Sequence, residues 1–347
     1  MNSRYTQLCQ WLTQATNILQ PELKMVAGDA SFRRYYRLLW RDTSYIVMDA
    51  PPPEEDCAPF VRIARHWFQQ GVHVPEVIAQ DLDQGFLLLQ DFGDDQLLST
   101  LLSPSTTGHN DLANAGRLYR KAQKSLIKIQ RTTGTGLELP PYNRELLLRE
   151  MALFRDWFCC QWLELELNDQ DISLLDRTFE CLSHSALQQQ QVPVHRDYHS
   201  RNLMLTEDDD IGIIDFQDAV QGPITYDLVS LLKDCYIHWP PEAVSHWCDD
   251  YQAEARLAGV LPENYPREKF HQEFDLMGAQ RHLKAIGIFA RLWLRDGKAN
   301  YLDDIPRTLQ HLLEATEKYQ NLSPFHQWLL DRVVPALNKK QSAKESI

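Results

Sequence analysis

The stretch that decides the fold reads His195-Arg196-Asp197-Tyr198-His199-Ser200-Arg201-Asn202, and it is followed by Ile213-Ile214-Asp215-Phe216. An aspartate on a loop, here Asp197, can accept a hydrogen bond from a hydroxyl group and align that group with a phosphorus atom. Five residues later the amide oxygen of Asn202 can ligate magnesium without adding charge. Thirteen residues beyond it, Asp215 ends an apolar run and offers the hard anionic ligand that magnesium prefers. The order and spacing of these three residues predict a phosphoryl-transfer site that uses ATP and Mg²⁺.

The segments around this stretch fall into two parts with different periodicity. Short β-branched or aromatic runs between turn residues predict strands at 22–27, 32–41, 44–50, 77–80 and 85–90. Helical periodicity predicts helices at 3–19, 57–70, 114–132, 144–163, 171–190, 241–258, 267–294 and 305–319. Three further short strands are expected at 192–194, 203–205 and 212–215, and a Ser/Thr-rich loop at 99–110.

This order predicts an α+β fold with two lobes. A small antiparallel-sheet lobe would cover residues 1–94, and a large, mostly helical lobe would cover residues 95–338. The polar, charged segment 339–347 is expected to form a frayed tail.

Composition excludes several classes of partner and location. The formal net charge of −13 argues against a protein that binds the phosphate backbone of nucleic acids. No window reaches the ~18 apolar residues of a spanning helix, and the amino terminus lacks the pattern of a signal peptide. Seven cysteines without CxxC spacing indicate free thiols in a reducing compartment, so we expect a cytoplasmic protein without membrane, nucleic-acid or obligate protein partners.

Over nearly its whole length the chain resembles the aminoglycoside/choline phosphotransferase branch of the protein-kinase-like fold. The resemblance implies that Asp197 is the catalytic base or positions the acceptor, and that Asn202 and Asp215 hold Mg²⁺. Within that branch the chain is most similar to the bacterial anomeric kinases of N-acetylmuramate and N-acetylglucosamine in cell-wall recycling. The motifs that carry the resemblance are Gly28-Asp29-Ala30-Ser31-Phe32-Arg33-Arg34-Tyr35-Tyr36-Arg37, Val47-Met48-Asp49-Ala50-Pro51-Pro52, His195 to Asn202, Gln280-Arg281-His282-Leu283-Lys284 and Gly287-Ile288-Phe289-Ala290-Arg291-Leu292.

The predicted nucleotide cover departs from the pattern of protein kinases. No G-x-G-x-x-G exists, and the short turn Gly28-Asp29-Ala30-Ser31 is the candidate that would cap the phosphates of ATP with its N–H groups. The phosphate-binding lysine of the third strand is replaced by Met48, and the helix at 57–70 has no Glu to pair with such a lysine. Strand alternation makes Arg34 the candidate cation for the phosphates, with an exposed salt-bridging arginine as the alternative.

Asp91-Phe92-Gly93 spells D-F-G but comes before the catalytic loop, where the hinge between the lobes is expected. We therefore expect backbone groups around Gln90, Asp91 and Phe92 to bind the adenine edge, and the Asp91 carboxylate to face solvent rather than a metal ion.

The acceptor is expected to be a small molecule. Only eleven residues separate Asp215 from Asp227, which leaves no room for a peptide platform. Asp227 itself would support the catalytic loop from the start of a helix. Arg201 could steady Asp197 or the transferring phosphate, and a cation on the late helix could meet a lactyl carboxylate, although helical charges usually form a solvated face. The candidate acceptor-binding residues are His199, Gln217, Asp218, Arg281 and Lys284.

These observations favour an ATP-dependent kinase that phosphorylates the anomeric hydroxyl of an amino sugar. Two alternatives remain open at this point. One is an aminoglycoside or amino-alcohol phosphotransferase, which a cluster of carboxylates facing Asp197 would support. The other is a non-catalytic ATP-binding scaffold, suggested by Met48 in place of the lysine.

Overall fold

The computed structural model describes residues 3–28, 32–103 and 112–345, which fold into two compact units. Unit 1 is formed by residues 1–103 together with 201–218, and unit 2 by residues 104–200 together with 219–347. The segment that carries Asn202 and Asp215 thus packs with the N-terminal part of the chain. The lobe boundary expected after residue 94 stays a prediction.

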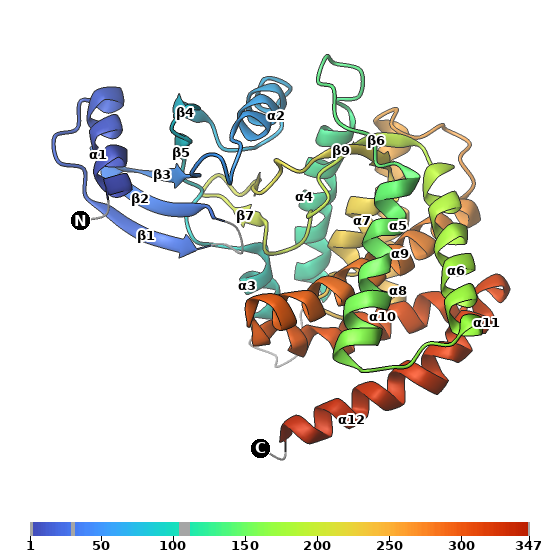
Figure 1. The fold of residues 1–347 in the computed structure, drawn as a ribbon. Helices are drawn as coiled ribbons and strands as arrows, with labels where there is room; N and C mark the ends of the chain where they lie inside the picture. Colours follow the sequence, from blue (N-terminus) through green and yellow to red (C-terminus); the bar gives the residue numbers. More distant parts are fainter. Residues whose placement is uncertain (1–2, 29–31, 104–111, 346–347) are drawn as a thin grey trace. The chain divides into compact units, whose positions relative to one another are not determined.

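Unit 1 is built on a five-stranded antiparallel sheet in the order β1-β2-β3-β5-β4 (Figure 1). The predicted strands are all present, because β-branched and aromatic runs alternate with tight turns. Their bounds are β1 Leu23–Gly28, β2 Arg34–Trp40, β3 Thr43–Asp49, β4 Val77–Asp81 and β5 Phe86–Gln90. Arg41 and Asp42 both adopt positive φ in the β2–β3 turn, as a two-residue hairpin of the primed type requires.

Among the described residues, three helices and a second, smaller pair of strands complete unit 1. Helix α1 (Ser3–Thr16) packs Leu8, Trp11 and Leu12 onto inward residues of the sheet in one apolar cluster. Helix α2 (Ala58–Gln69) begins after Asp56, whose side chain accepts a 2.8 Å hydrogen bond from the Ala58 N–H. The rest of unit 1 consists of α3 (Leu97–Leu102) and the antiparallel pair β7 (Leu203–Leu205) and β8 (Ile211–Ile213).

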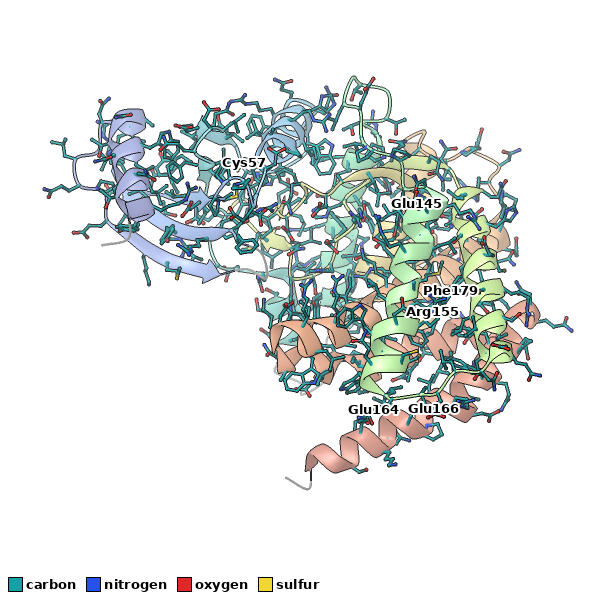
Figure 2. All side chains as sticks on the ribbon, in the orientation of Figure 1. Cys57, Glu145, Arg155, Glu164, Glu166 and Phe179 are labelled. Atoms are coloured by element: carbon teal, nitrogen blue, oxygen red, sulfur yellow. The ribbon has the colours of Figure 1, made fainter. Side chains whose placement is uncertain are left out.

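Unit 2 is helical and is organised around α9 (Arg267–Asp296), which packs against most of its neighbours (Figure 1). Its core joins α9 to α5, α6 and α10 through residues such as Phe179, labelled on α6 in Figure 2. The other elements are α4 Leu112–Gln130, α5 Arg144–Leu153, η1 Phe154–Trp162, α6 Asp169–Leu187, α7 Thr225–Leu232, α8 Pro241–Leu257, η2 Ala299–Asp304, α10 Ile305–Glu317, η3 Gln320–Leu322, α11 Ser323–Trp328, η4 Leu329–Val333, α12 Val334–Glu345, and the strands β6 Gln191–Val194 and β9 Val220–Pro223.

Four segments differ from the sequence expectations. The helix expected at 144–163 changes to a π-helix, η1, from Phe154 onward. Part of the loop expected at 99–110 belongs to α3, and residues 104–111 lie outside the described residues. Strand β9, which pairs with β6, was not expected.

The tail expected to fray from residue 339 is instead helical to Glu345, as the end of α12. Tertiary contacts hold this part of the chain to the segment before α6, where Glu164 and Glu166 are labelled in Figure 2. Lys340 Nζ lies 3.1 Å from the Glu164 carboxylate, and Arg332 donates a 2.8 Å hydrogen bond to the Glu166 carbonyl. Within the described ranges, no helix combines the length and the apolar character needed to cross a bilayer.

Candidate active site

Unit 1 contains a cavity of about 420 Å³, a volume that suits a small-molecule ligand. One part of its wall is the segment Gln90, Asp91 and Phe92, which was predicted to bind adenine. Another part is formed by Asn202 and Asp215, which were predicted to bind magnesium. Residues that are far apart in the sequence, and that were singled out for different parts of one nucleotide, therefore line the same cavity.

Apolar side chains form the wall that would receive a purine. Ile46 of β3 and Leu89 of β5 line the cavity on the sheet, and Met204 of β7 and Ile214 line it on the segment that follows the catalytic loop. These four side chains suit the flat, apolar faces of a purine ring.

Asn202 and Asp215 are placed as neighbours by the β7–β8 pair that lies between them. Asn202 Nδ2 lies 3.4 Å from Asp215 Oδ2, and the Ile214 N–H donates to the Asn202 carbonyl at 3.1 Å. Gln217 donates a 2.9 Å hydrogen bond to the other oxygen of Asp215. One carboxylate and one amide oxygen fit Mg²⁺, which takes few protein ligands and completes its shell with water and phosphate oxygens.

The backbone of Asp215 adopts a left-handed conformation with φ 66°. The next residue, Phe216, is fully buried and stacks on Phe60 of α2 with ring centroids 4.7 Å apart. Trp67 of the same helix contacts Phe216 at a centroid distance of 5.6 Å. The packing of α2 thus holds the chain next to Asp215 in place, and the uncommon backbone conformation sets the direction of its carboxylate.

Phe92 in the cavity wall packs directly against Gly212 of β8. A Cβ atom at Gly212 would lie 2.5 Å from the Phe92 ring, which is closer than real Cβ contacts allow. His73 meets the Phe92 ring edge-on with centroids 4.8 Å apart. The absence of a side chain at residue 212 therefore creates the space that Phe92 occupies.

The expectation that the Asp91 carboxylate faces solvent was wrong. Its side chain is only 2% exposed and accepts a 2.6 Å hydrogen bond from Arg37 Nε. It also accepts hydrogen bonds from Ser44 and from the Gly93 N–H. The buried Asp91 carboxylate is therefore satisfied by Arg37 of β2, Ser44 and the Gly93 N–H.

Arg37 is a residue of this site that the sequence analysis missed. It lines the cavity and also contacts Asp94 at 2.8 Å. The hydrogen bonds that Arg37 donates to Asp94 and then to Asp91 raise the pKa of Arg37, so its guanidinium stays positively charged. The alternation rule would have revealed it, because Arg37 follows Tyr35 on the face of β2 opposite to Arg34.

Arg34 and Met48, two other residues predicted to lie at the phosphates, do not line this cavity as the described residues define it. Arg34 is exposed on the face of β2 that Tyr36 and Leu38 share under α1. Met48 is buried within β3, and neither residue belongs to the cavity wall as far as the described part of the chain defines it. Gly28 ends β1, and Asp29, Ala30 and Ser31 lie outside the described residues. The roles proposed for these residues remain predictions.

In unit 2, Asp227 supports the loop that carries Asp197, which confirms the position expected for it. Its carboxylate lies in the first turn of α7 and accepts hydrogen bonds from the N–H groups of His195 at 2.7 Å and Arg196 at 3.0 Å. Arg196 has φ 78°, a backbone conformation that residues other than glycine rarely adopt. Burial raises the pKa of Asp227 to about 6, although the His195 side chain and the two N–H donors oppose that shift.

Asp197 is half-buried and surrounded by positive charge. Burial alone would raise the pKa of Asp197, but electrostatic interaction with Lys284, followed by His199, His195 and Arg196, lowers it to about 2. The carboxylate is therefore ionised at neutral pH and accepts hydrogen bonds. Of the residues expected to bind the acceptor, the structure places Lys284, His199 and Arg281 in the electrostatic environment of Asp197.

Glu150 of α5 is a second residue that the sequence analysis missed. It is 5% exposed and pairs with Arg196 at 2.6 Å and with Lys284 at 3.5 Å. Lys284 also donates to the Tyr226 hydroxyl at 2.9 Å. Although burial acts in the other direction, Lys284 and Arg196 lower the pKa of Glu150. Nothing in the helical pattern of α5 distinguishes this acid from an exposed one, because its partners come from distant segments.

The remaining predicted residues lie in both units. Arg201 and Gln217 line the cavity of unit 1, and Asp218 is exposed. In unit 2 Arg281 is buried, with a guanidinium nitrogen 3.5 Å from the Cys235 sulfur. His199 is half-buried, and burial lowers its pKa, so its ring is neutral at pH 7.

Comparisons with known proteins agree on one family. The model described as "Phosphotransferase enzyme family" matches residues 22–271. The N-acetylmuramate/N-acetylglucosamine kinase of Pseudomonas aeruginosa is 42% identical over 333 residues, which cover 93% of this chain and 95% of that protein. The protein of the same name from Neisseria meningitidis serogroup B is 40% identical over 95% of this chain and 96% of its own length.

The crystal structure of a spectinomycin phosphotransferase in complex with ADP and spectinomycin is similar in fold, with a TM-score of 0.59. It shares 15% sequence identity and covers 89% of this chain and 93% of its own. The similarity to both the relatives and the solved structure extends over the two units.

Proposed function

This chain belongs to the phosphotransferase enzyme family, and on that premise we propose that it phosphorylates the anomeric hydroxyl of N-acetylmuramate, N-acetylglucosamine or both, using ATP and Mg²⁺. The relatives that are 40% or more identical over most of their length carry the name of that activity. The place of the reaction would be the cytoplasm, where ATP is available and where the free thiols of all seven cysteines are stable.

The observation that carries the proposal is the cavity of unit 1. Its apolar walls and the Gln90–Phe92 segment suit adenine, and Asn202 with Asp215 offers the two oxygen ligands for a magnesium ion. Bound Mg²⁺ would neutralise charge on the β- and γ-phosphates during transfer. The cavity wall carries Arg37 and Arg201 but also the carboxylates of Asp91, Asp94 and Asp215, so bound Mg²⁺ would be needed to offset the charge of the nucleotide phosphates.

Asp197 is assigned the task of orienting the acceptor hydroxyl. A carboxylate with a pKa of about 2 is a weak base at neutral pH, so it acts by accepting a hydrogen bond more than by removing the proton before transfer. An anomeric hydroxyl is more acidic than an ordinary alcohol and suits such a weak base. Asp227 and Glu150 hold the loop on which Asp197 sits, through the His195 and Arg196 backbone and the Arg196 side chain.

The charges near Asp197 favour a sugar over a cationic acceptor. Lys284 exerts the largest influence that lowers the pKa of Asp197, and the Arg281 guanidinium acts on the same carboxylate. A positively charged aminoglycoside or amino alcohol would meet these cations, whereas the lactyl carboxylate of N-acetylmuramate would be attracted by them.

The proposal is tested by incubating the purified full-length chain with γ-labelled ATP and Mg²⁺. N-acetylmuramate, N-acetylglucosamine, an aminoglycoside and choline are offered separately, and ³¹P and ¹H NMR locate the new phosphate. We expect label on carbon 1 of an amino sugar. Transfer only to the aminoglycoside or to choline would replace the proposed acceptor. Absence of transfer even in a single turnover at high enzyme concentration would favour the ATP-binding scaffold.

A further inference from the structure

Three potential metal ligands meet in unit 2, among residues that take no part in the proposed transfer. His238 lies in the segment between α7 and α8, and His311 and Glu314 lie three residues apart on α10. Residues at this spacing share one face of a helix. One ligand atom from each of the three side chains lies within 4.8 Å of the others.

Hydrogen bonding alone does not satisfy this cluster. His238 Nε2 lies 2.8 Å from a Glu314 oxygen, but His311 Nδ1 is 3.9 Å from the other Glu314 oxygen, too far for a hydrogen bond. His311 Nδ1 is buried and has no hydrogen-bond partner among the described residues. An unpartnered imidazole nitrogen facing a carboxylate at this distance leaves room for an atom that binds both.

The other nitrogen of His311 already has the partner that a metal-ligating histidine needs. His311 Nε2 lies 3.4 Å from the Ile237 carbonyl. A proton on Nε2 directed to that oxygen leaves the lone pair of Nδ1 available, and histidine ligands of metals are commonly oriented through such a backbone contact.

Burial and a neighbouring ring hold His311 in place. His311 is only 2% exposed. The His282 ring stacks on the His311 ring at a centroid distance of 5.1 Å. Glu314 supplies the negative charge that offsets part of the charge of a divalent ion.

We propose that His238, His311 and Glu314 bind one Zn²⁺ ion, with water as the fourth ligand. Two imidazoles and one carboxylate are a donor set that zinc accepts in tetrahedral geometry, whereas Mg²⁺ prefers oxygen ligands. Ligand atoms on tetrahedral zinc lie about 3.3 Å apart, which follows from bonds of about 2.0 Å. The His311–Glu314 distance of 3.9 Å would therefore close by about 0.6 Å, and no pair of ligand atoms would need to approach by more than about 1.5 Å. The site is thus distinct in chemistry from the magnesium pair of unit 1.

The position of this site links it to the catalytic loop. Asp234, four residues before His238, accepts a 3.0 Å hydrogen bond from the Ser200 N–H and another from its hydroxyl. The ring of Tyr236, two residues before His238, lies against the His199 ring with centroids 5.5 Å apart. A zinc ion that joins His238 to α10 would therefore fix the segment that supports the loop after Asp197.

The test measures metal content rather than turnover, because chelators would also remove Mg²⁺. The full-length chain, freed of any histidine tag, is dialysed against Zn²⁺ with excess Mg²⁺, passed through a desalting column and analysed by ICP mass spectrometry. We expect about one zinc ion per chain for the wild type and a loss of tenfold or more in affinity for His238→Ala, His311→Ala and Glu314→Gln. His246→Ala, an exposed histidine of α8, is the matched control and should bind zinc as the wild type does.

Substitution with Co²⁺ provides a readout that misfolding cannot imitate. Tetrahedral Co²⁺ in the wild type should give visible d–d bands that Glu314→Gln weakens while its near-ultraviolet circular dichroism stays that of the wild type. His238→Ala, in a half-exposed position outside the helices, serves if Glu314→Gln fails to fold. A wild-type chain that retains no zinc would overturn the proposal, and so would variants that retain as much zinc as the wild type.

Discussion

Arg196 and Asp215 adopt left-handed backbone conformations, with φ of 78° and 66°. Each such conformation costs on the order of 1–3 kcal/mol and persists only where neighbouring groups hold it. At Arg196 the neighbour is the Asp227 carboxylate, and at Asp215 it is the packing of Phe216 on α2. Both strained residues belong to the segments that the sequence singles out for chemistry, which agrees with the use of strain to fix reacting groups.

At the residue scale, replacing Asp197 by Asn removes a charged acceptor and keeps the shape of the side chain. Turnover should fall by roughly 10²–10⁴-fold, the range typical of a proton-handling group, because the amide accepts a weaker hydrogen bond from the sugar hydroxyl. The dissociation constant of ATP, measured by calorimetry, should stay within about twofold because the cavity proposed to bind the nucleotide is lined by residues of unit 1 alone. An equal loss of ATP binding and turnover would argue that Asp197 shapes the nucleotide site instead.

Lys284 permits a second test at this scale, because only one of the two amino sugars carries a carboxylate. Lys284→Met should lower kcat/KM for N-acetylmuramate more than for N-acetylglucosamine, by a ratio of about 10–100, the value of one charge-assisted hydrogen bond. Because both sugars are measured on the same variant, the ratio is unaffected by any loss of activity that the two reactions share, such as one caused by breaking the contact between Lys284 and Glu150. An unchanged ratio would place the lactyl group elsewhere and leave Lys284 with a structural role.

At the element scale, Gly212 of β8 packs against Phe92 of the cavity wall so closely that no side chain fits at residue 212. Gly212→Ala would place a methyl group 2.5 Å from the Phe92 ring and displace it. The dissociation constant of ATP should rise about tenfold, since overpacking costs ~1–3 kcal/mol. In a Phe92→Ala background the same substitution should cost almost nothing, so a double-mutant cycle measures the coupling. Additive effects of the two substitutions would disprove the contact.

Two glycines of α9 differ in how closely their neighbours pack, so the same substitution at each one tests the packing of this helix. A Cβ at Gly287 would lie 2.3 Å from the Leu153 backbone at the α5–η1 junction, whereas one at Gly278 would meet its nearest neighbour at 3.7 Å. Gly287→Ala should lower the free energy of unfolding by about 2 kcal/mol or more, and Gly278→Ala should leave it unchanged or raise it slightly. Urea denaturation followed by circular dichroism measures both. Similar effects of the two substitutions would show that α9 can shift away from α5.

The helices and strands themselves were largely predictable, because their periodicity is local. The alternation of apolar residues gave the five strands of unit 1, and helical spacing gave α2, α4, α6, α8 and α10 with ends that differ by a few residues. The π-helix η1 was not predictable, because a change in hydrogen-bonding register leaves no compositional signal. Strand β9 was also missed, because it is short and forms only by pairing with β6.

At the scale of the whole molecule, the net charge of −13 gives the folded chain a general dependence on pH through self-repulsion. Asp227 adds its own contribution to the pH dependence of the free energy of unfolding, and the sign of that contribution follows from its pKa. Its pKa is raised from 3.8 to about 6, so between pH 4 and 6 the folded state binds more protons than the unfolded state. The contribution of Asp227 to stability must therefore fall as pH rises through that window.

Comparison with Asp227→Asn isolates this contribution, because the variant shares nearly all of the other charges. The variant should be less stable than the wild type at pH 4, since its amide group cannot accept both backbone hydrogen bonds. Its deficit in the free energy of unfolding should narrow by up to about 3 kcal/mol between pH 4 and pH 7. Urea unfolding across that range measures the difference, and a deficit that widens with pH would show that the pKa of Asp227 is not raised.

The sequence by itself determined the two-part α+β order, the proximity of Asn202 to Asp215 and the supporting role of Asp227. These features were readable because they rest on short spacings and on local periodicity, which a chain carries in any conformation. Only the tertiary structure decided that Arg37 rather than Arg34 lines the cavity of unit 1, that Glu150 pairs with Arg196 and Lys284, and that His238 meets His311 and Glu314. Each of these contacts joins segments that are distant in the sequence. Burial makes an unpaired charge costly, so the partner of a charged side chain is fixed only once folding has buried both groups.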